Sequence, residues 1–188
     1  MDALVIGAGF AGVCAGIRLK QAGFENFRIY DKATGIGGTW WNNTYPGAAC
    51  DVPSHLYCFS FKPNPHWSRQ YSPQAEIQAY IEDCVDTYGL RDHIHLGQHI
   101  LSLAYNDRTA RWHARFDDGE EVVARFVING SGGLHKPLIP AFEGREKFAG
   151  TSMHTARWNN DFDATGKDIA LIGSAASAIQ VLPAIAPD

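Results

Sequence analysis

The chain opens with a glycine pattern that few folds accommodate. A short apolar run, residues 3–6, leads directly into the sequence GAGFAG of residues 7–12, and residues 11–22 have the apolar spacing of a helix. A second apolar stretch, residues 27–30, ends at Asp31. This order of strand, glycine turn, helix, strand and acid is typical of a Rossmann-type dinucleotide-binding unit. The sequence therefore predicts an α/β fold that begins with a nucleotide site.

Each position of this unit has a physical reason. Gly7 permits the tight turn, Gly9 lets the backbone approach a pyrophosphate, and Gly12 lets the helix pack closely on the strand. The free amides and dipole at the start of the helix favour the anion. Asp31 can accept hydrogen bonds from the ribose hydroxyls, and an acid at this position argues against a 2′-phosphate in this first site.

Composition and charge exclude several other classes. The 188 residues are 45% hydrophobic and 19% charged, as in a soluble globular protein with a sizeable core. The net charge is −4 without a basic run, which disfavours nucleic acid and anionic membranes as partners. We find no signal peptide or transmembrane stretch, and the cysteines have neither CxxC nor zinc-site spacing. We therefore predict a cytoplasmic protein without a metal site.

The middle of the chain predicts one helix and a small antiparallel sheet. The helix begins after Ser72-Pro73, with Ser72 as its N-cap, and ends at Gly89. Three segments then alternate apolar and polar residues: 99–105, 111–116 and 121–129. We predict that they form an antiparallel β-meander inserted into the nucleotide-binding fold.

Two later glycine-rich turns also follow apolar segments. Residues 130–133 follow the apolar end of the meander, and they suit either close approach to a cofactor or a plain structural turn. Residues 168–172 form a second predicted strand, which runs into GSAASAIQ at 173–180. This is the expected start of a second dinucleotide unit. Ala175 takes the place of the second glycine, and its methyl group would push a pyrophosphate outward.

Further motifs resemble one family of flavoproteins. The sequence GGTW at 37–40 and YPGAACD at 45–51 resemble the class B flavoprotein monooxygenases, and more narrowly the Baeyer–Villiger monooxygenases. A stretch that begins at residue 148 also matches the Baeyer–Villiger fingerprint FxGxxxHxxxW. Its defined positions are Phe148, Gly150, His154 and Trp158. Asn159 departs from the family, which usually has Pro or Asp after the tryptophan.

The resemblance implies an FAD site and an NADPH site. The implied FAD contacts are Gly7, Gly9, Phe10, Ala11, Gly12, Asp31, Lys32, Gly38, Thr39, Trp40, Asp51, Tyr57 and Ile100, the last near the adenine. The implied NADPH contacts are Cys50, Ser174, Ala175, Ala176, Ser177, Ala178, Ile179 and Gln180. Asp51 is also the candidate catalytic residue, because the family's acid supports an arginine that lies beyond this chain. For His154 we favour a structural or gating role over acid–base chemistry.

The implied activity is insertion of one oxygen atom from O2 into a ketone, giving an ester or lactone. The resemblance divides the chain into an FAD-binding domain at 1–145, a linker with the fingerprint at 146–167, and the start of a truncated NADPH-binding domain at 168–188. The remainder of the enzyme is expected outside this chain. Two alternatives stay open: N- or S-oxygenation by the same cofactors, and a non-catalytic FAD-binding fragment.

Overall fold

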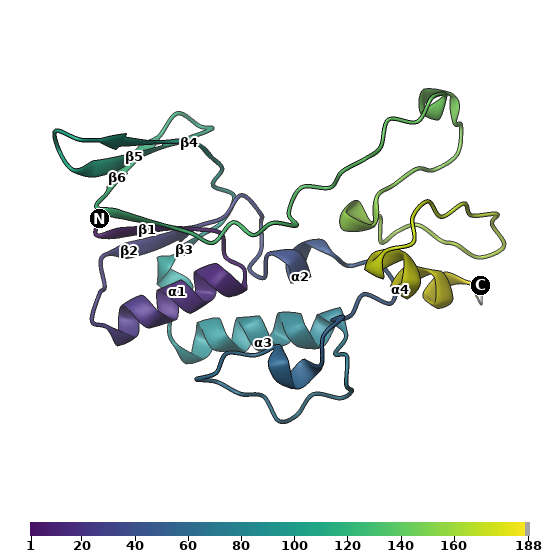
Figure 1. The fold of residues 1–188 in the computed structure, drawn as a ribbon, viewed down its shortest axis with the longest axis horizontal. Helices are drawn as coiled ribbons and strands as arrows, with labels where there is room; N and C mark the ends of the chain where they lie inside the picture. Colours follow the sequence, from purple (N-terminus) through teal and green to yellow (C-terminus); the bar gives the residue numbers. More distant parts are fainter. Residues whose placement is uncertain (187–188) are drawn as a thin grey trace. The chain divides into compact units, whose positions relative to one another are not determined.

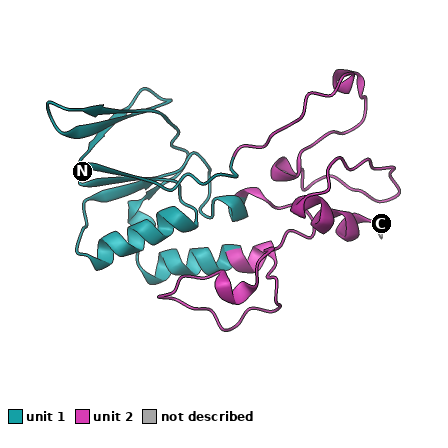
Figure 2. Ribbon diagram, viewed as in Figure 1, with its two compact units in different colours: residues 1–41, 78–135 teal, residues 42–77, 136–188 magenta. Residues whose placement is uncertain are grey.

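The structure, a computed structural model, describes residues 1–186 and divides into two compact units (Figure 1, Figure 2). The first unit combines residues 1–41 with 78–135, and the second comprises residues 42–77 and the chain from residue 136 onward. In the described residues, no helix has the length and apolar character that crossing a bilayer requires.

A four-stranded parallel sheet forms the centre of the first unit (Figure 1). Its strands are β1 (Ala3–Ile6), β2 (Phe27–Tyr30), β3 (Ile94–His95) and β7 (Phe126–Asn129), in the order β3-β2-β1-β7. Leu4 and Val5 of β1 are fully buried, as expected for a central parallel strand covered on both faces. The predicted α/β fold with a Rossmann-like unit is confirmed.

Helix α1 (Phe10–Gln21) connects β1 to β2 and begins within one residue of the predicted start. Its buried face includes Val13 and Ile17. A Cβ on Gly16 would lie 2.7 Å from Cδ1 of Ile29 and 3.3 Å from the methyl groups of Leu90. Gly16 therefore lets α1 approach β2 more closely than a larger residue would allow.

The predicted meander is present, but its third strand is shorter than expected. It consists of β4 (Ile100–Asn106), β5 (Arg111–Phe116) and β6 (Glu121–Ala124), all antiparallel. The prediction of one strand over residues 121–129 was wrong. The chain leaves the meander at Arg125 and continues in the parallel sheet as β7. The Arg125 amide donates to the carbonyl of Met1 at 3.1 Å, which begins the parallel pairing with β1.

The meander packs on the parallel sheet through one apolar cluster. Leu4 and Tyr30 come from the parallel sheet, and Ala114, Phe116 and Ala124 come from β5 and β6. All five are buried. The Tyr30 and Phe116 rings lie 4.9 Å apart between centroids. This cluster fixes the meander against the strands that carry the first nucleotide motif.

Helix α3 (Gln74–Thr87) follows the predicted pattern, with Ile77, Ile81 and Val85 fully buried. The hydroxyl of Ser72, predicted to cap this helix, is buried and donates to Oγ of Ser54 at 2.7 Å. The short helices are α2 (Thr39–Asn42), η1 (Ser54–Leu56), η2 (Arg91–His93), η3 (Arg145–Lys147) and η4 (Thr155–Arg157).

The second unit contains helix α4 (Ala176–Ile185), as the repeated motif predicts. The strand predicted at 168–172 is absent, and none of the strands in residues 1–186 pairs with this segment. A strand requires a neighbour to satisfy its backbone groups, and this explains why the apolar pattern alone produces no strand here. One buried cluster of this unit contains Tyr45, Ala48 and Val181, packed against Trp158, Leu171 and Ile185.

Candidate functional site

Three predicted features meet at the carboxyl edge of the parallel sheet. Ile6 is paired in register with Tyr30 on one side and with Asn129 on the other. The next residues of these strands are Gly7, Asp31 and Gly130, and they therefore lie in one row. In the sheet, β1 lies between β2, the next strand of the chain, and β7, the last one. Open α/β sheets bind ligands at such a switch point in strand order.

Backbone contacts explain the glycines in this row. A Cβ on Gly7 would lie 2.6 Å from the carbonyl oxygen of Gly130, and Gly7 has a φ of 94°. A Cβ on Gly12 would overlap the carbonyl oxygen of Gly7. A Cβ on Gly130 would lie 2.9 Å from the carbonyl oxygen of Ile6. Gly130 is thus required by packing against the first turn, which favours the structural interpretation of the 130–133 turn.

The first glycine turn lies against the GGTW motif. The amide of Gly37 donates to the carbonyl of Ala8 at 3.0 Å, and a Cβ on Gly38 would lie 2.9 Å from Cα of Gly9. Gly9 is the N-cap of α1 and has no side chain to accept from the first-turn amides. These amides are therefore oriented for an anion that approaches over Gly9.

Asp31 completes the nucleotide geometry. Its Oδ2 accepts from the amide of Ala8 at 2.7 Å, and its Oδ1 accepts from the amide of Ala33 at 2.8 Å. A carboxylate has about four acceptor positions, so each oxygen retains capacity for a ribose hydroxyl. The glycine row, the start of α1 and this acid together fit the adenosine and pyrophosphate of a dinucleotide.

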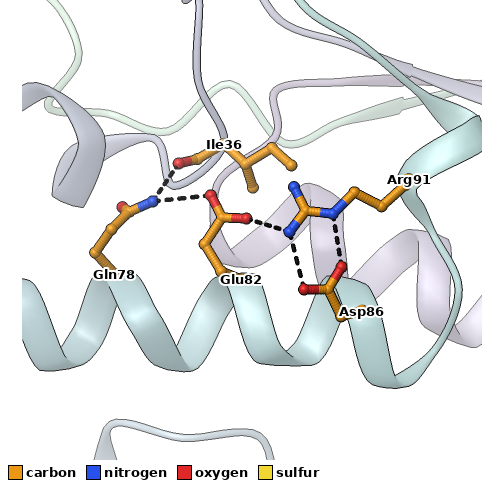
Figure 3. Close-up of polar contacts among 5 residues, drawn as sticks. All are labelled: Ile36, Gln78, Glu82, Asp86 and Arg91. Atoms are coloured by element: carbon orange, nitrogen blue, oxygen red, sulfur yellow. Dashed lines mark hydrogen bonds and ion pairs between the residues drawn. The ribbon is translucent and has the colours of Figure 1, made fainter.

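A polar network of α3 side chains and Arg91 of η2 reaches Ile36, the residue before the GGTW turn (Figure 3). Nε2 of Gln78 donates to the carbonyl of Ile36 at 2.7 Å and to Oε1 of Glu82 at 3.2 Å. Nη2 of Arg91 donates to Oε2 of Glu82 at 2.7 Å, and Nε of Arg91 donates to Oδ1 of Asp86 at 2.6 Å. The Arg91 hydrogen bond holds the pKa of Asp86 below its ordinary value.

Sequence reasoning missed this network. The spacing of Gln78 and Glu82 is a common helical pair, and nothing in it indicates the Ile36 carbonyl as a partner. A Cβ on Gly37 would overlap Oε1 of Gln78, so the amide also lies directly against the turn.

In the second unit, α4 is bound to the YPGAACD loop. The Tyr45 hydroxyl donates to Oε1 of Gln180 at 2.7 Å, and Nε2 of Gln180 donates to the carbonyl of Ala49 at 2.9 Å. The Ala49 amide completes the arrangement with a longer contact of 3.4 Å to the same Oε1. The side chain of Gln180, implied at the NADPH site, is therefore engaged with this loop.

The fingerprint residues have structural partners within the second unit. Trp158 packs against the cluster of Tyr45, Ala48 and Val181. Nδ1 of His154 accepts from the amide of Ala156 at 3.0 Å and caps η4, which favours the structural role over acid–base chemistry.

The other two fingerprint residues contact each other. Phe148 is 64% exposed, and a Cβ on Gly150 would lie 2.6 Å from the Phe148 ring. A larger residue at position 150 would therefore require the exposed Phe148 ring to move.

Comparison with known proteins identifies the relatives. A family profile described as an NAD(P)-binding Rossmann-like domain matches residues 5–72. A Baeyer–Villiger monooxygenase of Pseudomonas aeruginosa is 45% identical over 183 residues, which are 97% of this chain and 35% of that protein. The chain is similar to the Baeyer–Villiger monooxygenases over nearly its whole length. A second such enzyme, from Streptomyces coelicolor, is 44% identical with the same coverage of both chains. The chain spans about a third of the length of these relatives.

Solved structures of monooxygenases have the same fold as this chain. A steroid monooxygenase in its oxidized form bound to NADP aligns with a TM-score of 0.91 at 41% identity, over 99% of this chain and 36% of that one. A cyclohexanone monooxygenase bound to ε-caprolactone aligns with a TM-score of 0.93 at 38% identity, over 100% and 37% of the two chains. The resemblance inferred from the sequence motifs is confirmed.

The site residues implied by the Baeyer–Villiger resemblance divide between the two units. The first unit contains the implied FAD contacts from Gly7 to Trp40, and also Ile100. Among them Lys32 and Thr39 are exposed, Ile100 is half-buried and Trp40 is buried. The second unit contains Asp51, which is exposed, and Tyr57, which is half-buried. The structure therefore brings the residues implied as adenosine and pyrophosphate contacts together within one unit.

The implied NADPH set lies entirely in the second unit. Cys50 is buried, and burial raises the pKa of its thiol. Ala175 is the exposed N-cap of α4, with an extended backbone (φ −83°, ψ −177°) that any residue adopts. The remaining residues form the turn and the first turn of the helix: Ser174, Ala176, Ser177, Ala178 and Ile179. Within residues 1–186 no cluster of three acidic, histidine or cysteine side chains could hold a metal ion.

Proposed function

We propose that this chain forms the FAD-binding part of an FAD- and NADPH-dependent monooxygenase that inserts one oxygen atom from O2 into a ketone. The observation that carries the proposal is the row of Gly7, Asp31 and Gly130 at the carboxyl edge of the sheet, beside the start of α1. The similarity to Baeyer–Villiger monooxygenases over 97% of the chain supports the choice of reaction. A cytoplasmic location belongs to the same proposal.

The residues present fit FAD. The first-turn amides of α1, at Phe10 and Ala11, would hold the pyrophosphate, and Asp31 would accept from the ribose hydroxyls. Ile100 would lie near the adenine. The GGTW turn, from Gly38 to Trp40, would lie beside the flavin. Bound FAD supplies the redox chemistry with O2, and the chain contributes binding, orientation and exclusion of water.

We place the FAD-binding domain at 1–145, the linker at 146–167 and the start of the NADPH-binding domain at 168–188. In this scheme the 173–178 turn and the start of α4 hold the NADPH pyrophosphate, as in a repeat of the first unit. Asp51 is the group of this chain that we assign to tuning charge near the flavin. Its exposure is consistent with a partner from another part of the enzyme.

A second candidate is an FAD-binding module without turnover of its own. The observation that favours it is the unpaired 168–172 segment, because a Rossmann unit holds its glycine turn at the end of a paired strand. Visible absorption under air separates the two. Flavin bands that bleach with NADPH, and NADPH consumption that rises with added ketone, support the monooxygenase. Consumption that rises with an amine or sulfide instead would shift the reaction to N- or S-oxygenation, and flavin bands unmoved by NADPH would support the module.

A further inference from the structure

We propose that Gln180 is a positioning residue that couples the NADPH turn to the loop of residues 45–51, so that binding of one nucleotide tightens binding of the other. The inference rests on the proposed function, because it takes the 173–178 turn as the NADPH site and the 45–51 loop as part of the flavin environment. It adds a physical connection between the two segments, made by the side chain of Gln180, that neither sequence motif indicates.

The first argument is the completeness of the Gln180 contacts. Its Oε1 accepts from the Tyr45 hydroxyl at 2.7 Å and from the Ala49 amide at 3.4 Å, while its Nε2 donates to the Ala49 carbonyl at 2.9 Å. One side chain thus binds both backbone groups of Ala49. Cys50 and Asp51 follow Ala49 directly. The orientation of the Ala49 peptide groups therefore sets the direction of the chain at these two residues.

The second argument is the close contact between helix and loop. A Cβ on Gly47, which has a φ of 78°, would overlap the Gln180 carbonyl oxygen and lie 3.1 Å from Cβ of Ala184. Beside this contact Val181 is fully buried against Tyr45 and Ala48. The loop therefore lies directly on the backbone of α4 and is held there by both packing and hydrogen bonds.

The third argument is the position of Gln180 in α4. It lies four residues after Ala176, the first residue of the helix, and is therefore about one helical turn from the amides assigned to the pyrophosphate. A helical turn is stiff, so a nucleotide that fixes the start of α4 also fixes Gln180. The loop then loses less freedom when FAD binds, and linkage requires the effect to be reciprocal.

The test is an FAD titration by flavin fluorescence, with and without saturating NADP⁺, on the wild-type chain and on Gln180→Leu. Leucine has a similar size but makes none of the three hydrogen bonds. For the wild type we expect NADP⁺ to lower the FAD dissociation constant about tenfold, within the usual range of coupling between sites. For Gln180→Leu we expect the ratio of the two dissociation constants to fall below about twofold.

Two further variants separate coupling from folding. Tyr45→Phe removes one of the three hydrogen bonds and leaves the ring in the core, so an intermediate ratio is expected. Leu182→Ala lies on the same helix, where Leu182 is 53% exposed, and we expect it to keep the wild-type ratio. A loss of stability alone would weaken FAD binding equally with and without NADP⁺, and the ratio would not move.

The failures are distinguishable. A wild-type chain that binds neither nucleotide contradicts the proposed function itself. A wild-type chain that binds both with a ratio of one, or a Gln180→Leu variant that keeps the wild-type ratio, overturns the coupling while leaving the proposed function intact.

Discussion

The side-chain amide of Gln78 binds the carbonyl oxygen of Ile36 at 2.7 Å, directly before the Gly37-Gly38 turn. Ile36 is buried, so its carbonyl has little access to water. The turn in question lies against Gly9 of the nucleotide motif. Helix α3 therefore supports the GGTW turn of residues 37–40 through the hydrogen bond from Gln78 to Ile36.

Replacing Gln78 with leucine leaves the Ile36 carbonyl buried without its donor. We expect the free energy of unfolding to fall by about 1–3 kcal/mol, the usual cost of an unsatisfied buried polar group. FAD affinity should fall as well, because the turn beside Gly9 is released. Urea unfolding and FAD titration measure the two effects. The control is Gln21→Leu, which loses only an exposed contact with Arg18 and should change stability by less than about 0.5 kcal/mol. Equal losses of unfolding free energy in the two variants would contradict a stabilising hydrogen bond between Gln78 and Ile36.

The glycine row predicts a sharp difference between two alanine substitutions. In Gly12→Ala the new methyl group would overlap the Gly7 carbonyl, and we expect a loss of about 1–3 kcal/mol of stability from overpacking. In Gly133→Ala the methyl group meets no atom within 4 Å and should not destabilise the fold. Thermal unfolding of the two variants checks this. A Gly12→Ala protein as stable as the wild type would show that the turn is not packed as described.

His95 predicts the sign of the pH dependence of stability. Burial, followed by the charges of Arg28 and His93, lowers the pKa of His95, and its Nε2 is buried without a hydrogen-bond partner in the described part of the chain. Between the lowered pKa and the ordinary value of about 6.5, the unfolded state binds more protons than the folded state. The contribution of His95 to stability is therefore present above about pH 6.5 and is lost as the pH falls through that range. Urea unfolding at pH 7.5 and 5.5 should show a smaller decrease for His95→Phe than for the wild type, and equal decreases would argue against it.

Cys50 should react slowly with thiol reagents in the folded protein. Its side chain is buried, and burial followed by the charge of Asp51 raises the pKa of the thiol. Because the thiolate is the reactive form, alkylation at pH 8 should be about tenfold slower or more in the native state than in urea. Peptide mapping by mass spectrometry measures the rate at this residue. Native alkylation of Cys50 as fast as that of the half-buried Cys58 would contradict the burial described.

Local patterns predicted the parts of the fold whose causes are local. The order of β1, α1 and β2, and the position of Asp31 after β2, follow from apolar periodicity and glycine spacing. The division of residues 121–129 into two strands was not predictable, because apolar alternation continues through Arg125 while pairing with β1 decides where the chain changes sheets.

The missed contacts of the site have the same origin. Gln78 and Ile36 lie 42 residues apart, and Gln180 and Tyr45 lie 135 residues apart. A side-chain hydrogen bond between distant segments leaves no mark on the periodicity of either one. The motif around Gln180 therefore predicted a nucleotide contact, whereas the folded chain directs its amide to the loop of residues 45–51.

The most direct test of the account is whether the chain binds FAD through the edge that contains Asp31. The measurement is a calorimetric titration of the purified wild-type chain with FAD, repeated on Asp31→Ala. The account predicts binding of one FAD per chain by the wild type, and a dissociation constant at least about tenfold higher for the variant, since hydrogen bonds to a charged group contribute about 1.5–3 kcal/mol. Wild-type protein that folds but binds no FAD, or an Asp31→Ala variant with unchanged affinity, would contradict it.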